Sequence, residues 1–159
     1  MDCNAENLGH VQRRHSSHGG ILSLEKGFNI TTMCASVLEG EFSIHIKQKL
    51  NISAMQTAIN LFTGNHDFSA FRSSGCQAKT PIKSIKEANI DVRENKLIFV
   101  FKAQSFLYQQ IRIMVGTLLE IGQNNKKPDW IEELFLSKNR SLAGPTMPSK
   151  GLILKGIQY

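Results

Sequence analysis

The chain has few cysteines and no long hydrophobic run. Its three cysteines, Cys3, Cys34 and Cys76, are odd in number, widely spaced and without a CxxC pair, which argues against a disulfide framework or a thiolate zinc site. No segment reaches the roughly 18 consecutive apolar residues of a membrane-spanning helix, and the N-terminus lacks the basic start and apolar run of a secretory signal. We therefore expect an intracellular protein with reduced cysteines and no membrane association.

Acidic residues are in the minority. The 159 residues include 19 Lys and Arg against 13 Asp and Glu, a formal net charge of +6. This balance favours a polyanionic partner, with nucleic acid the first candidate, although many soluble proteins are mildly basic. A composition of 41% hydrophobic and 20% charged residues is that of a globular chain, and the length suits one domain with a substantial core.

The two parts of the chain differ in pattern. Residues 1–40 are rich in His, Ser, Gly and Asn and show no period of 2 or 3.6, so an irregular leader is expected. The histidines of HVQRRHSSHGG (10–20) have no carboxylate or thiolate partner at metal-ligand spacing, which favours a solvated tail over a metal site. Hydrophobic periodicity is sustained over residues 41–159, where we expect the folded domain.

Within that domain the periodicity predicts strands and helices in a recognisable order. The run 97–101 is apolar on both faces, which predicts a central strand, and Glu94-Asn95 is the expected turn before it. The order strand, helix, strand, strand, helix, helix, strand is close to the split βαβ pattern of ferredoxin-like and RRM-like sheets. We therefore predict an α+β fold with a mainly antiparallel sheet and helices on one face. The expected elements are a strand at Phe42, Ile44 and Ile46, a helix from Asn51 or Ser53 to Gly64, strands over 85–92 and 97–101, helices over 105–122 and from Pro128 to Phe135, and a strand over 151–155.

Arg112 is the most informative residue. It lies in SFLYQQIRIMVGTLLEIG (105–122), a predicted helix with mostly apolar positions, where Tyr108 precedes it and Val115 follows it on one stripe. A guanidinium stays protonated. The side chain therefore either extends to solvent along its aliphatic stem or meets an anionic partner in a cleft, whose carboxylate would be a catalytic candidate. The residues alone leave both readings open.

The adjacent pair His66-Asp67 is a second candidate. A metal-dependent phosphohydrolase would need further His and Asp ligands at helical spacing, and none is apparent. Asp67 equally suits a cap for the turn that follows. Phe68 and Phe71 are interpreted first as core anchors, with stacking on a nucleobase as the alternative.

A basic stretch follows the aromatic pair. It contains Arg72, Lys79, Lys83 and Lys86, which suit a phosphate backbone, although a solvated face explains them almost equally well. Cys76 lies in the same stretch, but it has no nearby base or orienting group that would activate it as a nucleophile.

Four ordered motifs carry a resemblance to a known family. They are GNHDFSAF (64–71), AQSFLYQQIRIMVGTLLEIG (103–122), NRSLAGPTMPSKGL (139–152) and the closing LKGIQY. Together they resemble the TruA-type tRNA pseudouridine synthases, in which a G-x-HDF-x-x-F element, an arginine-bearing helix and an AG-T-A-x-x-GL-x-L ending follow one another. SFLYQQIR is most similar to the eukaryotic pseudouridine synthase-like branch. The resemblance covers residues 41–159.

This resemblance implies isomerisation of a flipped-out uridine to pseudouridine in tRNA, by an essential aspartate and without metal or cofactor. It implies that Arg112 pairs with that aspartate and keeps it ionised and aimed, and that lysines of the basic stretch hold tRNA phosphates. The residues implied to line the active-site cleft are His66, Asp67, Phe68, Phe71, Tyr108, Gly151 and Leu152.

The chain also departs from the family pattern. It has no arginine-threonine-aspartate-x-glycine-valine-histidine element, which carries the aspartate in the family, and no R-x-Y-x-Y stretch. Ile113 replaces the usual Asn, while Tyr108 and Gln109 replace two His, which puts RNA contacts through those side chains in question. We therefore expect the C-terminal half of such an enzyme, inactive alone, joined to an unrelated leader over residues 1–40.

Two alternatives accompany this expectation. One is a non-catalytic RNA-binding or dimerisation module, which forms a homodimer or pairs with a full-length enzyme. The weaker one is a phosphohydrolase centred on His66-Asp67. The eukaryotic branch suggests a mitochondrial location, although the first residues form no clear presequence.

Overall fold

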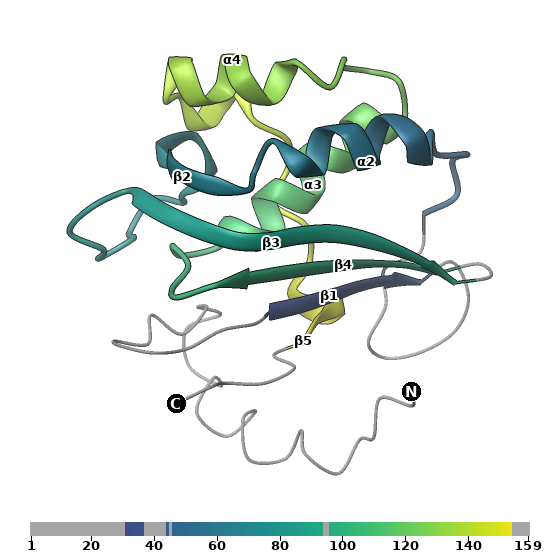
Figure 1. Cartoon of the computed structure of the whole chain (residues 1–159), viewed down its shortest axis with the longest axis horizontal. Coiled ribbons are helices and arrows are strands. Elements are labelled where there is room, and N and C mark those ends of the chain that lie inside the picture. Colours follow the sequence, from purple (N-terminus) through teal and green to yellow (C-terminus); the bar gives the residue numbers. More distant parts are fainter. Residues whose placement is uncertain (1–30, 37–43, 45, 94–95, 154–159) are drawn as a thin grey trace, which may run out of the picture.

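The computed structural model describes residues 31–36, 44, 46–93 and 96–153. These residues form a five-stranded sheet in the order β2-β3-β4-β1-β5, and every described strand pair is antiparallel. The α-helices lie together on one face of the sheet (Figure 1). The predicted α+β class, with helices on one face, is confirmed.

The elements have the following bounds. The strands are β1 (Thr31–Ser36), β2 (Gly64–Asp67), β3 (Ile82–Arg93), β4 (Lys96–Ala103) and β5 (Leu152–Ile153). The α-helices are α2 (Ile52–Asn60), α3 (Gln110–Gly122) and α4 (Trp130–Ser137), and the 3₁₀ turns are η2 (Ser69–Phe71), η3 (Arg140–Leu142) and η4 (Ser149–Gly151).

The strand order is that of a split βαβ fold. The chain runs from β1 through α2 to β3, and β4 lies between those two strands in the sheet. It then runs from β4 through α3 and α4 to β5, and β1 lies between that second pair. Both crossovers are therefore split by one strand, as in ferredoxin-like sheets, with β2 added at the edge beside β3.

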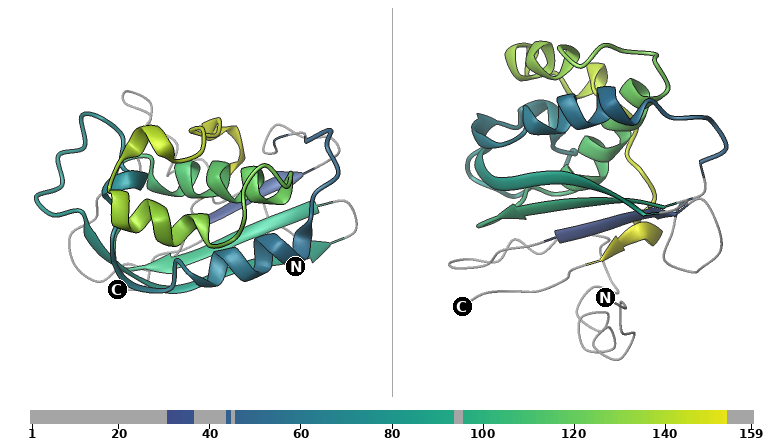
Figure 2. Two further views of the ribbon diagram at one scale, coloured as in Figure 1. Left: turned by 90° about the horizontal axis from the view of Figure 1, so that it is seen from above. Right: turned by 45° about the vertical axis from the view of Figure 1, so that its right-hand side comes forward.

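Helix α3 occupies the centre of the molecule. Every residue of α3 except Arg112 and Glu120 is buried, because the sheet covers one side of the helix while α2, α4 and the later segments cover others (Figure 2). The sheet contributes Phe99 and Phe101 of β4, which are fully buried. Alternate residues of a strand face the same side, so these two rings point at the helices.

Several predicted elements are confirmed. The Asn51 side chain caps α2, since its Oδ1 accepts from the Ala54 N–H at 3.1 Å. β3 contains the predicted strand 85–92, and β4 is central in the sheet, as its run of apolar residues predicted. α4 begins shortly after Pro128, and β5 opens the predicted closing strand. Its later residues and the turn at 94–95 lie outside the described residues.

The predicted strand at 42–46 is wrong where the structure describes it. Ile44 and Ile46 are in no strand and pack, partly buried, against the core in the connection leading to α2; Phe42 lies outside the described residues. The first-strand position is filled by β1, whose residues pair with β4 from Thr31↔Phe101 to Ser36↔Lys96. Its position lies within residues 1–40, for which the sequence predicted no regular structure.

Two helix boundaries also differ from the predictions. α2 ends at Asn60 rather than near Gly64, which has a φ of +108° and begins β2, a strand that the sequence pattern did not reveal. α3 begins at Gln110 rather than residue 105, because Gln109 adopts a left-handed conformation with φ 61°. Tyr108 therefore lies in a turn and does not share a helical stripe with Arg112.

Candidate functional site

Arg112 lies in the first turn of α3 and is bound to the segment that precedes β5. Its Nε donates to the Met147 carbonyl oxygen at 2.5 Å, and the Met147 N–H donates to the Arg112 carbonyl oxygen at 3.2 Å. Partial burial lowers the pKa of Arg112, and the nearby Tyr108 opposes that shift. The guanidinium remains charged, yet no carboxylate among the described residues forms an ion pair with it.

The segment beside Arg112 approaches α3 more closely than any side chain would allow. A Cβ at Gly116 would lie 1.9 Å from the Pro145 carbonyl oxygen, and one at Gly144 would lie 2.5 Å from the Thr117 nitrogen. The Gly144 N–H also donates to the Thr117 Oγ1 at 3.1 Å. The segment can therefore pack this closely against α3 only because both positions are glycine.

Arg140 braces the outside of the same segment. Its Nη1 donates to the Gly144 carbonyl oxygen at 3.0 Å, and its Nη2 donates to the Thr146 Oγ1 at 2.9 Å. Partial burial lowers the pKa of Arg140. The sequence predictions missed Arg140 and Met147. The only signal for either was their place in the NRSLAGPTMPSKGL motif.

Tyr108 is held by the turn that precedes α3. The fully buried Gln110 side chain accepts from the Leu107 N–H at 2.7 Å, and the Tyr108 carbonyl oxygen accepts from the Ser73 N–H at 3.3 Å. Tyr108 is half-buried, and its bond to Ser73 joins this turn to the loop that follows η2. The turn therefore places the Tyr108 side chain close enough to Arg112 to affect the pKa of the guanidinium.

Gly151 and Leu152 follow the same segment into the sheet. Gly151 ends η4, and Leu152 begins β5, where it pairs with Met33 of β1. Both residues therefore lie a short distance along the chain from Met147, on the continuation of the segment that contacts Arg112.

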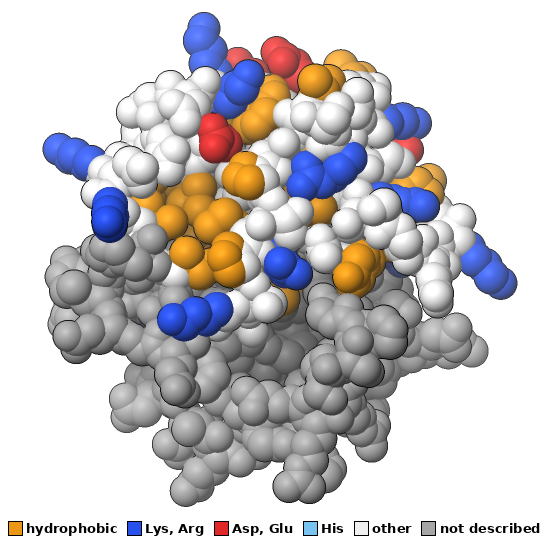
Figure 3. Space-filling view, turned by 180° about the vertical axis from the view of Figure 1, so that it is seen from behind, with side chains coloured by type: hydrophobic (Ala, Val, Ile, Leu, Met, Phe, Trp, Pro, Cys, Tyr) orange, Lys and Arg blue, Asp and Glu red, His pale blue; other side chains and the backbone are white. Residues whose placement is uncertain are grey.

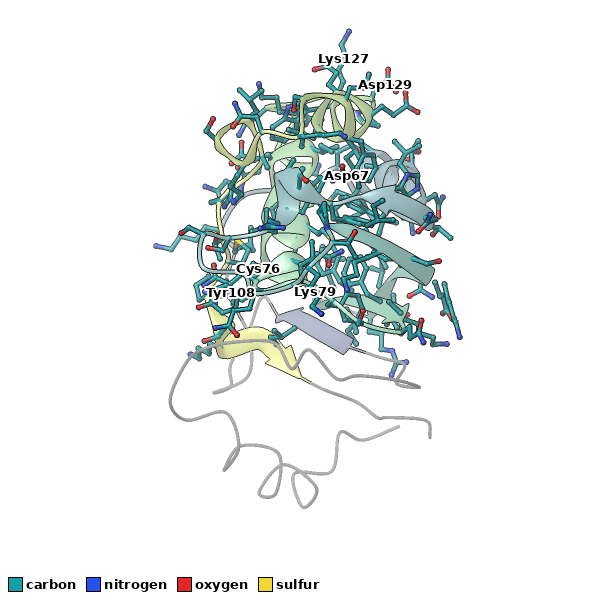
Figure 4. The ribbon with its side chains drawn as sticks, turned by 90° about the vertical axis from the view of Figure 1, so that its left-hand side faces the viewer. Asp67, Cys76, Lys79, Tyr108, Lys127 and Asp129 are labelled. Atoms are coloured by element: carbon teal, nitrogen blue, oxygen red, sulfur yellow. The ribbon has the colours of Figure 1, made fainter. Side chains whose placement is uncertain are left out.

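His66 and Asp67 belong to another part of the molecule. His66 stacks on Phe135 of α4 at 4.5 Å between ring centroids, and its Nε2 lies 2.9 Å from the Thr63 carbonyl oxygen. Asp67 accepts from the Ser69 N–H and hydroxyl and pairs with Lys138 at 2.9 Å. Figure 4 places Asp67 well away from Tyr108.

The carboxylate of Asp67 therefore stabilises the fold through its contacts with Ser69 and Lys138. Burial opposes its ionisation, but the hydrogen bonds from Ser69 and Lys138 outweigh that effect and hold the pKa of Asp67 below its ordinary value. The capping interpretation of Asp67 describes these contacts. In the part of the chain that the structure describes, no three His, Cys, Asp or Glu side chains gather as a metal site.

Phe68 and Phe71 are buried in the core of the described residues. Both side chains are fully buried and pack edge-on against Phe135 in one aromatic cluster, in which Phe62 stacks on Phe68 and meets Phe71 edge-on. A ring with no exposed face offers no surface for a nucleobase, so the burial of these two rings supports their interpretation as core anchors over the cleft role that the resemblance implied.

The basic stretch is dispersed rather than gathered into one patch. Lys79 and Lys86 are exposed, Arg72 is half-buried, and the Lys83 Nζ donates to the Ser105 Oγ at 2.9 Å. Lys83 pairs with His66 in the sheet, whereas Lys86 lies next to the bulge between Ile85 and Glu87. On the face seen from behind, Lys and Arg side chains are widely spread, with acidic ones mostly toward the upper edge (Figure 3).

None of the helices in the described ranges is long and apolar enough to cross a membrane.

Comparison with known proteins identifies clear relatives. The profile of a family described as tRNA pseudouridine synthase matches residues 58–159. The chain is 44% identical over 110 residues to tRNA pseudouridine synthase A of Dechloromonas aromatica, covering 69% of this chain and 42% of that protein. It is 45% identical over 114 residues to the Ehrlichia chaffeensis protein of the same name, covering 72% and 46%. A third relative, from Buchnera aphidicola, is 39% identical over 126 residues, covering 79% and 48%.

The matches cover only part of each relative's length. The chain spans about half the length of the curated relatives it matches. The matched half includes the Arg112 helix, the Arg140–Met147 segment and β5.

Proposed function

Since this chain belongs to the TruA-type tRNA pseudouridine synthase family, we propose that it provides the arginine-bearing wall of a uridine-isomerising cleft that acts on tRNA. The observation that carries the proposal is the state of Arg112. In a helix that is otherwise almost entirely buried, this guanidinium is half-exposed, fixed through Nε, and without an ion-pair partner among the described residues.

The role of Arg112 in this proposal is to hold a catalytic carboxylate. A cation within about 4–6 Å of a carboxylate favours its ionised form, and the Nε bond to Met147 leaves the two terminal nitrogens to meet it. Tyr108, Gly151 and Leu152 would line the same wall. His66 and Asp67 would support it through α4 and η2 rather than touch the substrate.

The proposal also holds that the 159 residues do not turn over uridine alone, because the family's aspartate element is not among them. The direct test is tritium release from tRNA labelled at uridine C5. No release is expected from the chain alone, and turnover by it would overturn this part of the proposal.

A chimera supplies the aspartate. Residues 58–159 of this chain replace the matching part of the Dechloromonas aromatica relative, and tritium release is then expected. Arg112→Ala should abolish it, whereas Arg93→Ala, which removes an exposed arginine paired with Asp91 on β3, should not. Equal rates for the two variants would remove Arg112 from the mechanism.

A second candidate function is a tRNA-binding module without catalysis. It is favoured by the net charge of +6 and by the basic side chains spread over the face in Figure 3. Retention of tRNA that weakens steeply with salt, without isomerisation by the chimera, would support this function over the first. Sedimentation of the chain alone and mixed with a full-length relative would test homodimerisation and pairing, and imaging of a tagged chain would test the mitochondrial location.

A further inference from the structure

The segment 143–148 has no regular secondary structure, although it lies against the central helix. Its backbone polar groups therefore have no ladder of hydrogen bonds and must be satisfied by other groups. Gly144 is buried, and its two backbone groups are satisfied by side chains: the N–H by Thr117 and the carbonyl oxygen by Arg140.

Arg140 reaches two points on this segment at once. One terminal nitrogen binds the Gly144 carbonyl oxygen and the other binds the Thr146 hydroxyl. Pro145 lies between them, with its carbonyl oxygen against Gly116 of α3. The planar, forked guanidinium suits this two-point contact, which a lysine ammonium on a single flexible stem does not reproduce.

The braced segment leads directly to the acceptor of Arg112. Met147 follows Thr146 in the chain, and its carbonyl oxygen and N–H both bind Arg112. A change in the position of residues 144–146 would therefore move Met147, and the Nε anchor of Arg112 would move with it.

We infer that Arg140 is a positioning residue: by bracing Gly144 and Thr146 it holds Met147, and through Met147 it fixes the direction of the Arg112 guanidinium. The consequence for catalysis rests on the proposed function, in which Arg112 aims a carboxylate. The effect on Arg112 itself does not depend on that function.

The competing assignment for Arg140 is a tRNA phosphate contact. Its side chain is half-buried, and a donor on each of its terminal nitrogens is already engaged inside the protein. A phosphate contact would have to break or share these bonds, whereas Lys79 and Lys86 are exposed. The contacts of Arg140 therefore favour positioning over RNA binding.

The test is hydrogen exchange of the Arg112 Nε–H, followed by NMR on the full chain. Arg140→Lys keeps the charge but loses the fork, and Thr146→Val removes one acceptor at nearly constant shape. Each should accelerate exchange of the Arg112 Nε–H by about tenfold, as expected for loss of roughly one hydrogen bond. Arg93→Lys makes the same chemical change at an exposed ion pair on β3 and should have no effect.

Unchanged Arg112 exchange in Thr146→Val overturns the inference, and this variant decides alone if Arg140→Lys does not fold. In the chimera, Arg140→Lys should lower kcat and leave KM and its salt dependence unaltered. A raised KM with a shallower salt dependence would instead make Arg140 an RNA contact and overturn the inference. If the unsubstituted chimera releases no tritium, the proposed function fails, while the exchange measurement still decides the role of Arg140.

Discussion

Arg112 and Met147 are joined by two hydrogen bonds that run in opposite directions, although 35 residues separate them in the chain. One bond uses the side-chain Nε and the other uses the backbone carbonyl of Arg112. Helix α3 and the segment before β5 are therefore fixed to each other at the residue that carries the proposed function.

Replacement of Arg112 by lysine tests whether the positive charge alone is sufficient or whether the Nε hydrogen bond to Met147 is also needed. Arg112→Lys keeps the positive charge but loses the Nε donor, so the Met147 carbonyl oxygen loses this partner. We expect tritium release by the chimera to fall by about tenfold or more, the rate equivalent of roughly 1.4 kcal/mol. Circular dichroism should show an unchanged fold, and a rate equal to that of the unsubstituted chimera would mean that charge alone suffices.

Two glycines of α3 should respond differently to alanine. Gly116→Ala places a methyl group against the backbone oxygen of Pro145, whereas Gly122→Ala meets the Met55 sulfur, at the flexible end of a side chain. Overpacking against backbone should lower the free energy of unfolding by about 1–3 kcal/mol, and Gly122→Ala should cost less. Urea unfolding of the two variants measures this difference, and equal losses would contradict the close approach at Gly116.

The contribution of Asp67 to stability should depend on pH. Its folded-state pKa is lowered, so the ionised form stabilises the fold above the unfolded-state pKa, and this contribution is lost as pH falls through the folded-state pKa. Asp67→Asn should lower the free energy of unfolding by about 0.5–1 kcal/mol at neutral pH, and the variant should converge with the unsubstituted chain in acid.

The control for this titration is Asp129→Asn, because Asp129 makes no side-chain capping bond at the start of α4. Urea unfolding across the pH range should show little difference between this variant and the unsubstituted chain. A loss of stability for Asp67→Asn that persists unchanged in acid would show that its carboxylate charge is not the cause.

If Phe68 is a core residue, its substitution should lower the stability of the domain without changing its affinity for tRNA. Phe68→Leu should lower the free energy of unfolding by on the order of 1–2 kcal/mol, because it leaves a void beside the fully buried rings of Phe62 and Phe71. Its affinity for tRNA, measured by filter retention well below the unfolding transition, should not change. Leu136→Ala, at a position 84% exposed, should leave both quantities within error. A selective loss of tRNA binding in Phe68→Leu would restore the stacking role.

Exposed lysines should affect tRNA binding through salt dependence. Each phosphate contact contributes about 0.9 to the slope of log affinity against log salt for a duplex. The pair Lys79→Gln and Lys86→Gln, both exposed, should reduce this slope by about 1–2 in total. Lys83→Gln should reduce it less, because its Nζ already donates to Ser105. An unchanged slope in the double variant would place tRNA elsewhere.

The hydrophobic periodicity of the sequence correctly predicted elements that bury one face or both faces. Strand β4 was predicted as central because its run 97–101 is apolar on both faces. Asn51 was one of the two predicted caps of α2, with Ser53 the other, because the side-chain oxygens of these residue types suit the orphan N–H groups there. Periodicity failed at β1 and β2, which have little hydrophobic alternation of their own. These strands are held by pairing with β4 and β3, which are distant in sequence.

The site was predictable only in part for a related reason. Arg112 stood out because a cation interrupts a buried helical pattern. Arg140 and Met147 did not, because their roles arise from contacts with Gly144, Thr146 and Arg112 rather than from residue type.

The sequence by itself determined the α+β class, the burial of α3 and the exceptional position of Arg112, because these follow from the periodicity of hydrophobic residues and from the permanent charge of a guanidinium. The tertiary structure decided which groups surround that charge. In the folded domain Phe68 and Phe71 are buried in the core, Asp67 forms an ion pair with Lys138, and the Met147 carbonyl oxygen accepts a hydrogen bond from Arg112. Such contacts join segments far apart in the chain, and only the packing of the whole domain brings them within hydrogen-bonding distance.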